Sequence, residues 1–217
     1  MVLSMQTVGF ANLMNKNKTK KGGEKMKISI SDKNSKLGKI PNISLTPVAS
    51  CPNCSTCKSK CYALKAYRQY PASKKAWDNN LEQARMPNGI FFIQLDNYLA
   101  SKKPKYFRIH VAGDFFSQNY LDNWKLLVAK YPDTKFLAFT KSFHLDYSKL
   151  PKNLKIIFSV FKGMNEKSIP LTGSRSYAGE VIGKRKNETI LNCTGKCDQC
   201  GICWQLPNNH SVYFDMH

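Results

Sequence analysis

The chain has 217 residues, and its apolar content of 42% is enough to bury the core of one globular domain. No apolar run reaches the roughly 18 residues that a membrane span requires, so a transmembrane protein is excluded. Lysine and arginine number 34 against 14 acidic residues, which gives a formal charge of +20. This charge predicts a polyanionic partner such as DNA or RNA, and the alternative is that a lysine-rich coding bias has raised the count.

The first residues do not resemble a secretory signal, because no basic segment precedes an apolar stretch and a small-residue cleavage site. We therefore expect a cytoplasmic protein without disulfides, in a compartment that keeps thiols reduced. Residues 1–39 are rich in lysine and predict a basic arm or a small edge hairpin. Residues 40–217 are expected to form a single α/β metal-binding domain, and the sequence leaves its oligomeric state open.

The middle of the chain alternates predicted strands and helices. A short strand within 40–48 leads into the first cysteine segment, and helices are expected at 73–85 and 89–100. The order then continues with a strand at 106–111, a helix at 117–130 with Ser117 as its N-cap, and strands at 135–140 and 154–161. Two successive crossovers predict a parallel sheet covered by helices.

The last third of the chain is less regular. The stretch 169–186 contains three glycines and predicts a long irregular loop, in which Arg175 and Tyr177 would be exposed or would contact a nucleotide. A final strand is expected at 211–215.

Eight cysteines form two compact clusters near opposite ends of the chain, with none between them. The first quartet has the spacing C-x2-C-x2-C-x3-C and consists of Cys51, Cys54, Cys57 and Cys61. The second quartet has the mirrored spacing C-x3-C-x2-C-x2-C and consists of Cys193, Cys197, Cys200 and Cys203.

Thiols at this spacing can reach several corners of one cube of iron and sulfide, and the first spacing is the one that bacterial ferredoxins use. The quartets therefore predict one or two iron–sulfur clusters of the [4Fe–4S] type. Zinc held by four thiolates is the alternative, although structural zinc more often uses two C-x2-C pairs separated by a dozen or more residues.

The second quartet contains the C-x3-C-x2-C spacing with which radical S-adenosylmethionine enzymes hold a cluster that has one free iron site. In those enzymes the triad follows the first barrel strand, a place that the first quartet occupies in this chain. Cys51, Cys57 and Cys61 could hold such a cluster there, with Cys54 as an extra thiol.

Polar side chains follow the predicted strands at their carboxyl ends, where ligands gather in parallel sheets. Period-two alternation places Arg108 and His110 on one face, and Gly113 turns the chain to present Asp114. We expect catalytic roles for His110, Asp114 and Lys141. We expect cofactor binding by Arg108, Gly113, Thr140 and Ser159.

Each catalytic candidate has a structural alternative. Asp114 could cap the helix that starts near Ser117, His110 could be a core histidine, and Lys141 could be a solvated lysine.

Several motifs together resemble the phage gene product 88 family. They are Cys51-Pro52, Cys57-x3-Cys61-Tyr62-Ala63, Arg108-Ile109-His110-x2-Gly113-Asp114-Phe115, Tyr120-x3-Trp124, Thr140-Lys141-Ser142, Cys200-x2-Cys203-Trp204 and Val212-x-Phe214-x2-His217. The resemblance covers about residues 40–217 and implies a partial or full (β/α) barrel, a cluster near the strand ends and a site of action in the host cytoplasm. Cys54 departs from the three-thiol pattern, since a fourth ligand would close the free iron site.

Two functions remain. One is an iron–sulfur enzyme of the radical S-adenosylmethionine-like type, which binds S-adenosylmethionine and acts on or binds nucleic acid. The other is a non-catalytic module that grips DNA or RNA through phosphates and uses both quartets as closed zinc or iron–sulfur sites. A redox carrier with two clusters would leave the large α/β body without a role.

Overall fold

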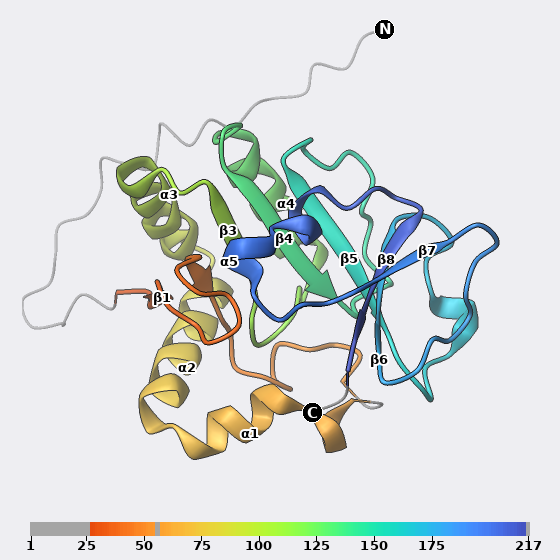
Figure 1. The fold of residues 1–217 in the computed structure, drawn as a ribbon. Coiled ribbons are helices and arrows are strands. Elements are labelled where there is room, and N and C mark those ends of the chain that lie inside the picture. Colours follow the sequence, from red (N-terminus) through yellow and green to blue (C-terminus); the bar gives the residue numbers. More distant parts are fainter. Residues whose placement is uncertain (1–26, 55–56, 216–217) are drawn as a thin grey trace, which may run out of the picture.

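The computed structural model describes residues 27–54 and 57–215 (Figure 1). They form an eight-stranded sheet in the order β1-β2-β3-β4-β5-β6-β8-β7. Neighbouring strands are parallel except for β1 and β2, which are antiparallel. Among the described residues, no helix is both long and apolar enough to span a membrane.

The strands are β1 (Ile30–Ser31), β2 (Asn42–Ile43), β3 (Tyr106–Ile109), β4 (Lys135–Thr140), β5 (Leu154–Val160), β6 (Ser174–Ala178), β7 (Thr189–Asn192) and β8 (His210–Phe214). The α-helices are α1 (Tyr62–Gln69), α2 (Pro71–Arg85), α3 (Ile90–Lys102), α4 (Gln118–Ala129) and α5 (Cys197–Cys200). Short 3-10 helices are η2 (Lys58–Lys60), η3 (Glu166–Ser168) and η4 (Ile202–Gln205).

One face of the sheet packs against α2, α3 and α4 and holds the main core. Because side chains alternate along a strand, Phe107 of β3 and Phe136 of β4 point to this face. They join Trp124 of α4 and Phe91 of α3 in a cluster of aromatic rings. Helix α4 begins as predicted, since the Ser117 hydroxyl accepts a hydrogen bond of 3.2 Å from the Tyr120 amide.

The opposite face is covered by α5 and η4, and Figure 1 shows α5 in front of β3 and β4. Leu37 and Ile40, which follow β1, join the same cluster. Trp204 and Leu206 pack there against Leu137 and Ile157. This second core is smaller than the first.

The sheet is mixed α/β and mostly parallel, but it does not close. Strands β1 and β7 are its two edges, so the described strands form no full barrel. In a (β/α) barrel the sheet closes on itself and helices surround it. Here the long helices pack on one face of an open sheet, and short helices cover the other face.

The expectation of an irregular loop at 169–186 is wrong, because strand β6 lies within it and pairs with both β5 and β8. Arg175 and Tyr177, expected to be exposed, are only 3% and 0% exposed. Arg175 donates to the carbonyls of Gly183 and Pro170, and Tyr177 donates to Glu188. The polar side chains of β6 form hydrogen bonds within the protein, so its sequence lacks the alternation of apolar and polar residues by which a strand is predicted.

The expected basic arm falls only partly within the described residues. Residues 1–26 lie outside them, and the following segment contributes β1 and a turn from Asn34 to Gly38.

Candidate functional site

The first quartet lies over the carboxyl end of the sheet. The segment after β2 is tied to the end of β3 by a hydrogen bond of 2.9 Å from the Leu45 amide to the Ala112 carbonyl. Asn53, within the quartet, donates to the Lys141 carbonyl just after β4 at 2.8 Å. The loop therefore crosses the strand ends where parallel sheets bind ligands.

Gly113 makes this close packing possible. Its φ is +87°, and a Cβ at this position would lie 2.5 Å from the Ser50 hydroxyl and 2.8 Å from the Leu45 Cβ. Only glycine adopts this conformation readily and leaves room for the neighbouring segment. Gly113 thus supports the first quartet through backbone packing.

The thiols of the first quartet interact with one another. Burial raises the pKa of Cys51 to about 12, with Asp114 and Cys54 adding to the increase. Burial raises the pKa of Cys57 to about 11, while Lys141 opposes this effect and Cys54 and Cys61 reinforce it. Cys54, only 9% exposed, is therefore close to both Cys51 and Cys57.

The second quartet lies on the sheet face that α5 and η4 cover. All four of its cysteines line one small cavity of about 30 Å³. The Cys197 amide donates to the Lys36 carbonyl at 3.0 Å, and the Cys193 amide donates to the Tyr213 carbonyl at 2.8 Å. Burial raises the pKa of Cys203 to about 12, against the opposing charge of Arg108.

The donor chemistry of both quartets fits a thiolate-bound metal. Four thiols within each short segment suit iron–sulfur or zinc, and those of the second quartet share one cavity. Among the described residues, however, no three or more His, Cys, Asp or Glu side chains are arranged to hold a metal ion. Metal binding would need to draw the thiols of each loop together and displace their protons.

Asp114 is a buried connector between β3 and β4. Its carboxylate accepts hydrogen bonds from the Phe115 amide at 2.7 Å, the Thr140 hydroxyl at 2.6 Å and the Lys141 amide at 2.7 Å. Burial raises its pKa, although Lys141 and these bonds oppose the shift. Asp114 does not cap α4, since Ser117 does, and Thr140 is buried in the same network.

His110 lies on the helix side of the sheet, so the expectation that it shares a face with Arg108 is wrong. Strand β3 ends at Ile109, and His110 has a φ of +58°, which turns its ring away from the strand alternation. The ring stacks on Tyr120, whose hydroxyl is 3.0 Å from Nε2. Burial, together with Arg108, lowers its pKa to about 3, which fits a neutral core histidine.

Arg108 lies on the cysteine side of the sheet. Its guanidinium lies 4.1 Å from the ring centre of Phe139, and its Nε donates to the His110 carbonyl at 3.3 Å. Burial lowers its pKa, while Tyr62, Cys203 and Cys197 oppose the shift. Arg108 therefore lies within electrostatic reach of two cysteines of the second quartet and of Tyr62, which directly follows the last cysteine of the first quartet.

Lys141 and Ser159 follow on the next two strands. The Lys141 ammonium lies 5.5 Å from the ring centre of Phe161, and its pKa is raised because Asp114, Cys57 and Tyr62 outweigh the effect of burial. Ser159 is half-buried and accepts a hydrogen bond of 3.3 Å from Ser176. Neither Arg108 nor Lys141 has a carboxylate within 4.0 Å in the described part of the chain.

Tyr62 and Phe139 contribute to this site and were missed as site residues. Tyr62 donates its hydroxyl to the Val111 carbonyl and influences both Arg108 and Lys141. The alternation along β4 could have identified Phe139, because it shares a face with Lys141.

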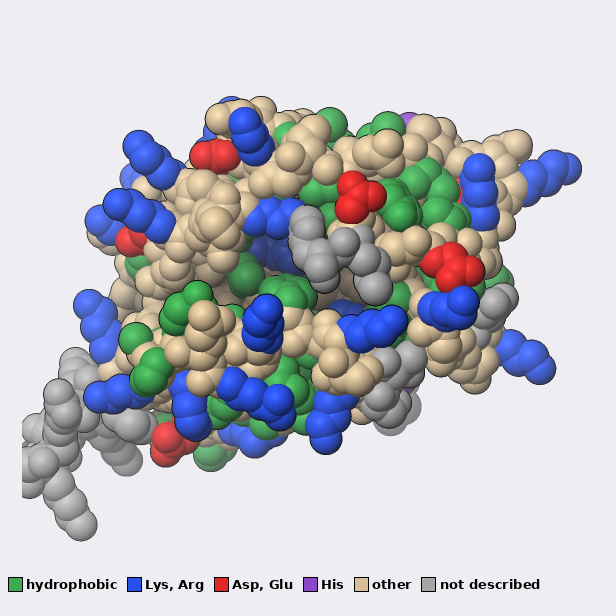
Figure 2. All heavy atoms as spheres, turned by 60° about the horizontal axis from the view of Figure 1, so that its bottom comes forward, with side chains coloured by type: hydrophobic (Ala, Val, Ile, Leu, Met, Phe, Trp, Pro, Cys, Tyr) green, Lys and Arg blue, Asp and Glu red, His purple; other side chains and the backbone are tan. Residues whose placement is uncertain are grey.

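Figure 2 views the carboxyl end of the sheet and shows a hollow with Lys or Arg side chains deep inside it. Further Lys and Arg side chains surround the hollow on the same face of the molecule. The candidate site thus combines eight cysteines, arranged in two groups, with a strongly basic surrounding.

Comparison with known proteins gives one family and two curated relatives. A family model described as Gene product 88 matches residues 11–206. The Gene 88 protein of Mycobacterium phage L5 is 29% identical over 185 residues, which cover 71% of this chain and 77% of that protein. The Gene 88 protein of Mycobacterium phage D29 is 27% identical over 198 residues, which cover 76% of this chain and 81% of that protein. No solved structure matches the chain.

Proposed function

The chain belongs to the gene product 88 family, and from this premise we propose that it is an iron–sulfur protein of the radical S-adenosylmethionine-like type. The first quartet would hold the reactive cluster through Cys51, Cys57 and Cys61. The supporting observation is the position of this quartet over the carboxyl ends of parallel strands, where the Asn53 amide reaches the Lys141 carbonyl. The second quartet would hold a separate site on the sheet face.

A bound [4Fe–4S] cluster with one iron free of thiolate would supply an electron and a coordination position for S-adenosylmethionine. The residues of the chain supply the electrostatics and the positioning. Lys141 is close to Cys51 and Cys57 and offsets the negative charge that their thiolates would carry. Asp114 fixes the Lys141 backbone and the loop after β3, so it acts as a positioning residue.

Cys54 decides whether the first site is open. It is close to both Cys51 and Cys57, so it is well placed to be the fourth ligand of a closed site. In the proposed function it stays outside the coordination sphere while S-adenosylmethionine is bound. A closed four-thiolate site would leave the protein with a structural or electron-carrying role.

Substitution at Cys54 tests the proposal directly. The protein is purified without oxygen, reconstituted with iron and sulfide, reduced in the presence of S-adenosylmethionine, and assayed for 5′-deoxyadenosine. We expect the wild type and Cys54→Ala to form this product and Cys57→Ala to form none. Absence of product from a fully loaded wild-type protein would contradict the proposal, as would loss of the first cluster in Cys54→Ala alone.

A second candidate is a non-catalytic module that binds DNA or RNA, with zinc or closed clusters as structural sites. A basic groove of about 330 Å³ beside the first quartet favours it. The groove is lined by Lys58, Lys65 and Arg68, none of which has a carboxylate within 4.0 Å in the described residues. This candidate predicts binding to unrelated sequences that weakens steeply as salt increases, and salt-independent binding would exclude it.

A further inference from the structure

We propose that Arg108 and Lys141 form a binding site for the phosphate group of a nucleotide, either free or within single-stranded nucleic acid. The site would lie between the two cysteine quartets on the open part of the sheet face. It goes beyond the iron–sulfur function, and it does not require either quartet to hold a cluster.

Two contacts hold the Arg108 side chain in place. Stacking on Phe139 and the hydrogen bond from Nε to the His110 carbonyl hold the guanidinium plane. The two terminal nitrogens make no hydrogen bond to a described residue, so that edge of the guanidinium is free. A planar fork with two free nitrogens matches two oxygens of one phosphate, and little entropy is lost because the side chain is already held.

Lys141 supplies a second positive charge on the same surface. It follows Phe139 by two residues on β4 and its extension, so the two side chains share one face. The Tyr62 hydroxyl donates to the Val111 carbonyl, one residue beyond the His110 carbonyl that accepts from Arg108. Strands β3 and β4 are parallel neighbours, so Arg108 near the end of β3 and Lys141 just after β4 lie at the same edge of the sheet. Arg108 is half-buried and has no carboxylate within 4.0 Å among the described residues, so it would gain from an anionic ligand. The charge of Asp114 keeps the nearby Lys141 protonated, so Lys141 remains a cation beside such a ligand.

Exposed aromatic surface beside the cations favours a nucleotide over a simple phosphate. Residue Tyr62 is 69% exposed, and the hydrogen bond from its hydroxyl to the Val111 carbonyl holds its side chain in place. On the other side, Phe139 contacts Phe214 at 5.7 Å between ring centres, and Lys36 lies 4.4 Å from the Phe214 ring centre. Nucleobases stack on such rings, and stacking contributes about 1–3 kcal/mol per base in single-strand binders.

The second quartet offers the competing explanation for Arg108. Arg108 opposes the raised pKa values of Cys197 and Cys203, so it could serve only as a counter-charge for thiolates. In that case its removal would weaken metal retention and leave nucleotide binding unchanged. The experiment must therefore record metal content and nucleotide binding on the same samples.

Competition for a fluorescent single-stranded oligonucleotide with a 5′-phosphate tests the proposal on the full-length protein as purified. The competitors are adenosine, AMP, inorganic phosphate and the unlabelled oligonucleotide. We expect AMP to compete at least about tenfold better than adenosine, since charge-assisted hydrogen bonds contribute this much. Comparison of AMP with the oligonucleotide distinguishes a free nucleotide from nucleic acid as the ligand.

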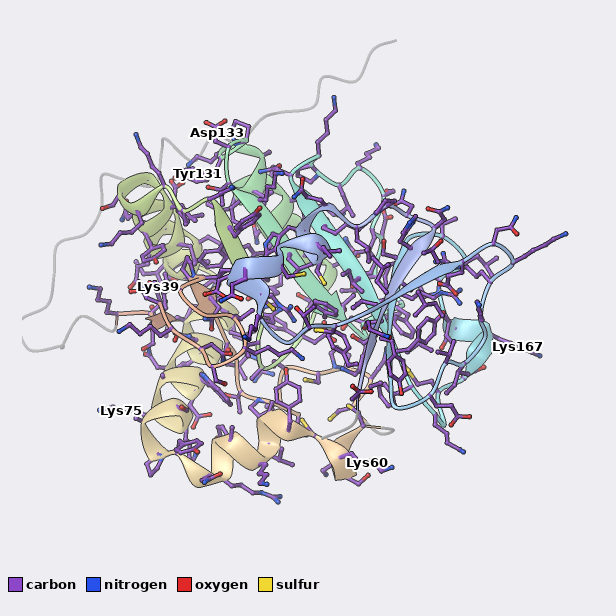
Figure 3. The ribbon with its side chains drawn as sticks, viewed as in Figure 1. Lys39, Lys60, Lys75, Tyr131, Asp133 and Lys167 are labelled. Carbon is purple, nitrogen blue, oxygen red and sulfur yellow. The ribbon has the colours of Figure 1, made fainter. Side chains whose placement is uncertain are left out.

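Three variants complete the test. Arg108→Gln should weaken binding of the phosphorylated ligand about tenfold or more, and Arg108→Lys should weaken it less because the charge remains. Lys167→Gln removes one charge from an exposed residue that Figure 3 shows at the far edge of the molecule, and it should leave binding nearly unchanged. All three should keep the wild-type metal content.

Equal binding of AMP and adenosine by the wild type would overturn the proposal, as would equal effects of Arg108→Gln and Lys167→Gln. Loss of metal in Arg108→Gln with unchanged nucleotide binding would assign Arg108 to the second quartet. A protein without iron or sulfide that still prefers AMP would support the phosphate site and contradict the iron–sulfur function, so the two failures are distinguishable.

Discussion

The two faces of the sheet differ in how completely their side chains are buried. On the helix face, Trp124, Phe91, Phe107 and Phe136 are fully or nearly fully buried and fill one continuous core. On the cysteine face, Phe139, Arg108 and Lys141 are half-buried. Neither Arg108 nor Lys141 has a carboxylate within 4.0 Å among the described residues. The helix face supplies most of the apolar burial that stabilises the fold, whereas the cysteine face combines half-buried cations with the two cysteine quartets.

The largest expected difference between the faces concerns stability. Trp124→Ala should lower the free energy of unfolding by about 3–5 kcal/mol, because a large buried ring leaves a cavity among four other aromatic side chains. Phe139→Ala should cost about 1–2 kcal/mol, since its ring is only half-buried. Urea denaturation of both variants measures the difference, and equal costs would remove the distinction between the faces.

A smaller effect is expected at the glycine that supports the first quartet. Gly113→Ala should destabilise the protein by about 2 kcal/mol or more, because positive φ and close contact with Leu45 act together. Gly89→Ala is the matched control: its φ is +67°, but a Cβ there would meet nothing within 4 Å. It should cost only about 1 kcal/mol, and thermal unfolding of both variants separates packing from backbone strain.

Over the range from pH 7.5 to pH 5.5, the smallest effect is the pH dependence of His110 on the helix face. Its pKa is lowered to about 3 in the folded protein, while an unfolded histidine titrates near 6.5. Between these values the unfolded state binds more protons, so stability is fully present above about pH 6.5 and is lost as pH falls. The slope should approach 1.4 kcal/mol per pH unit.

His110→Gln should reduce this slope, as measured by urea denaturation at pH 7.5, 6.5 and 5.5. A slope that the substitution does not change would mean that His110 is not the neutral core residue described above.

Sequence patterns predicted the helix face well. The unit β3-α4-β4 was predicted because its apolar positions follow helical and strand periods, and because Ser117 is a strong N-cap. Strand β6 was missed, since Ser174, Arg175 and Ser176 are polar residues that become buried through internal hydrogen bonds. These hydrogen bonds depend on partners elsewhere in the chain, so they leave no periodic pattern of apolar residues in the sequence.

The candidate site was predictable in part. The cysteines were identified by their spacing, and Asp114 and Lys141 because they follow strands. The structure brings Cys51 of the first quartet within electrostatic reach of both Asp114 and Lys141. His110 was misplaced because a positive φ outside glycine cannot be read from alternation. Alternation along β4 could have placed Phe139 on the face of Lys141, but its contact with Arg108 depends on the pairing of β3 with β4 and could not be predicted from that pattern.

Iron and sulfide analysis of protein purified without oxygen tests the central claim most directly, namely that the first quartet holds an iron–sulfur cluster. Wild-type protein is compared with a Cys51→Ala, Cys57→Ala, Cys61→Ala variant and with a variant that carries alanine at Cys193, Cys197 and Cys200. We predict a brown wild-type protein with equal iron and sulfide, and a loss of about four iron atoms per chain in the first variant. A colourless protein with stoichiometric zinc and no sulfide would contradict the claim, and so would unchanged iron in the first-quartet variant.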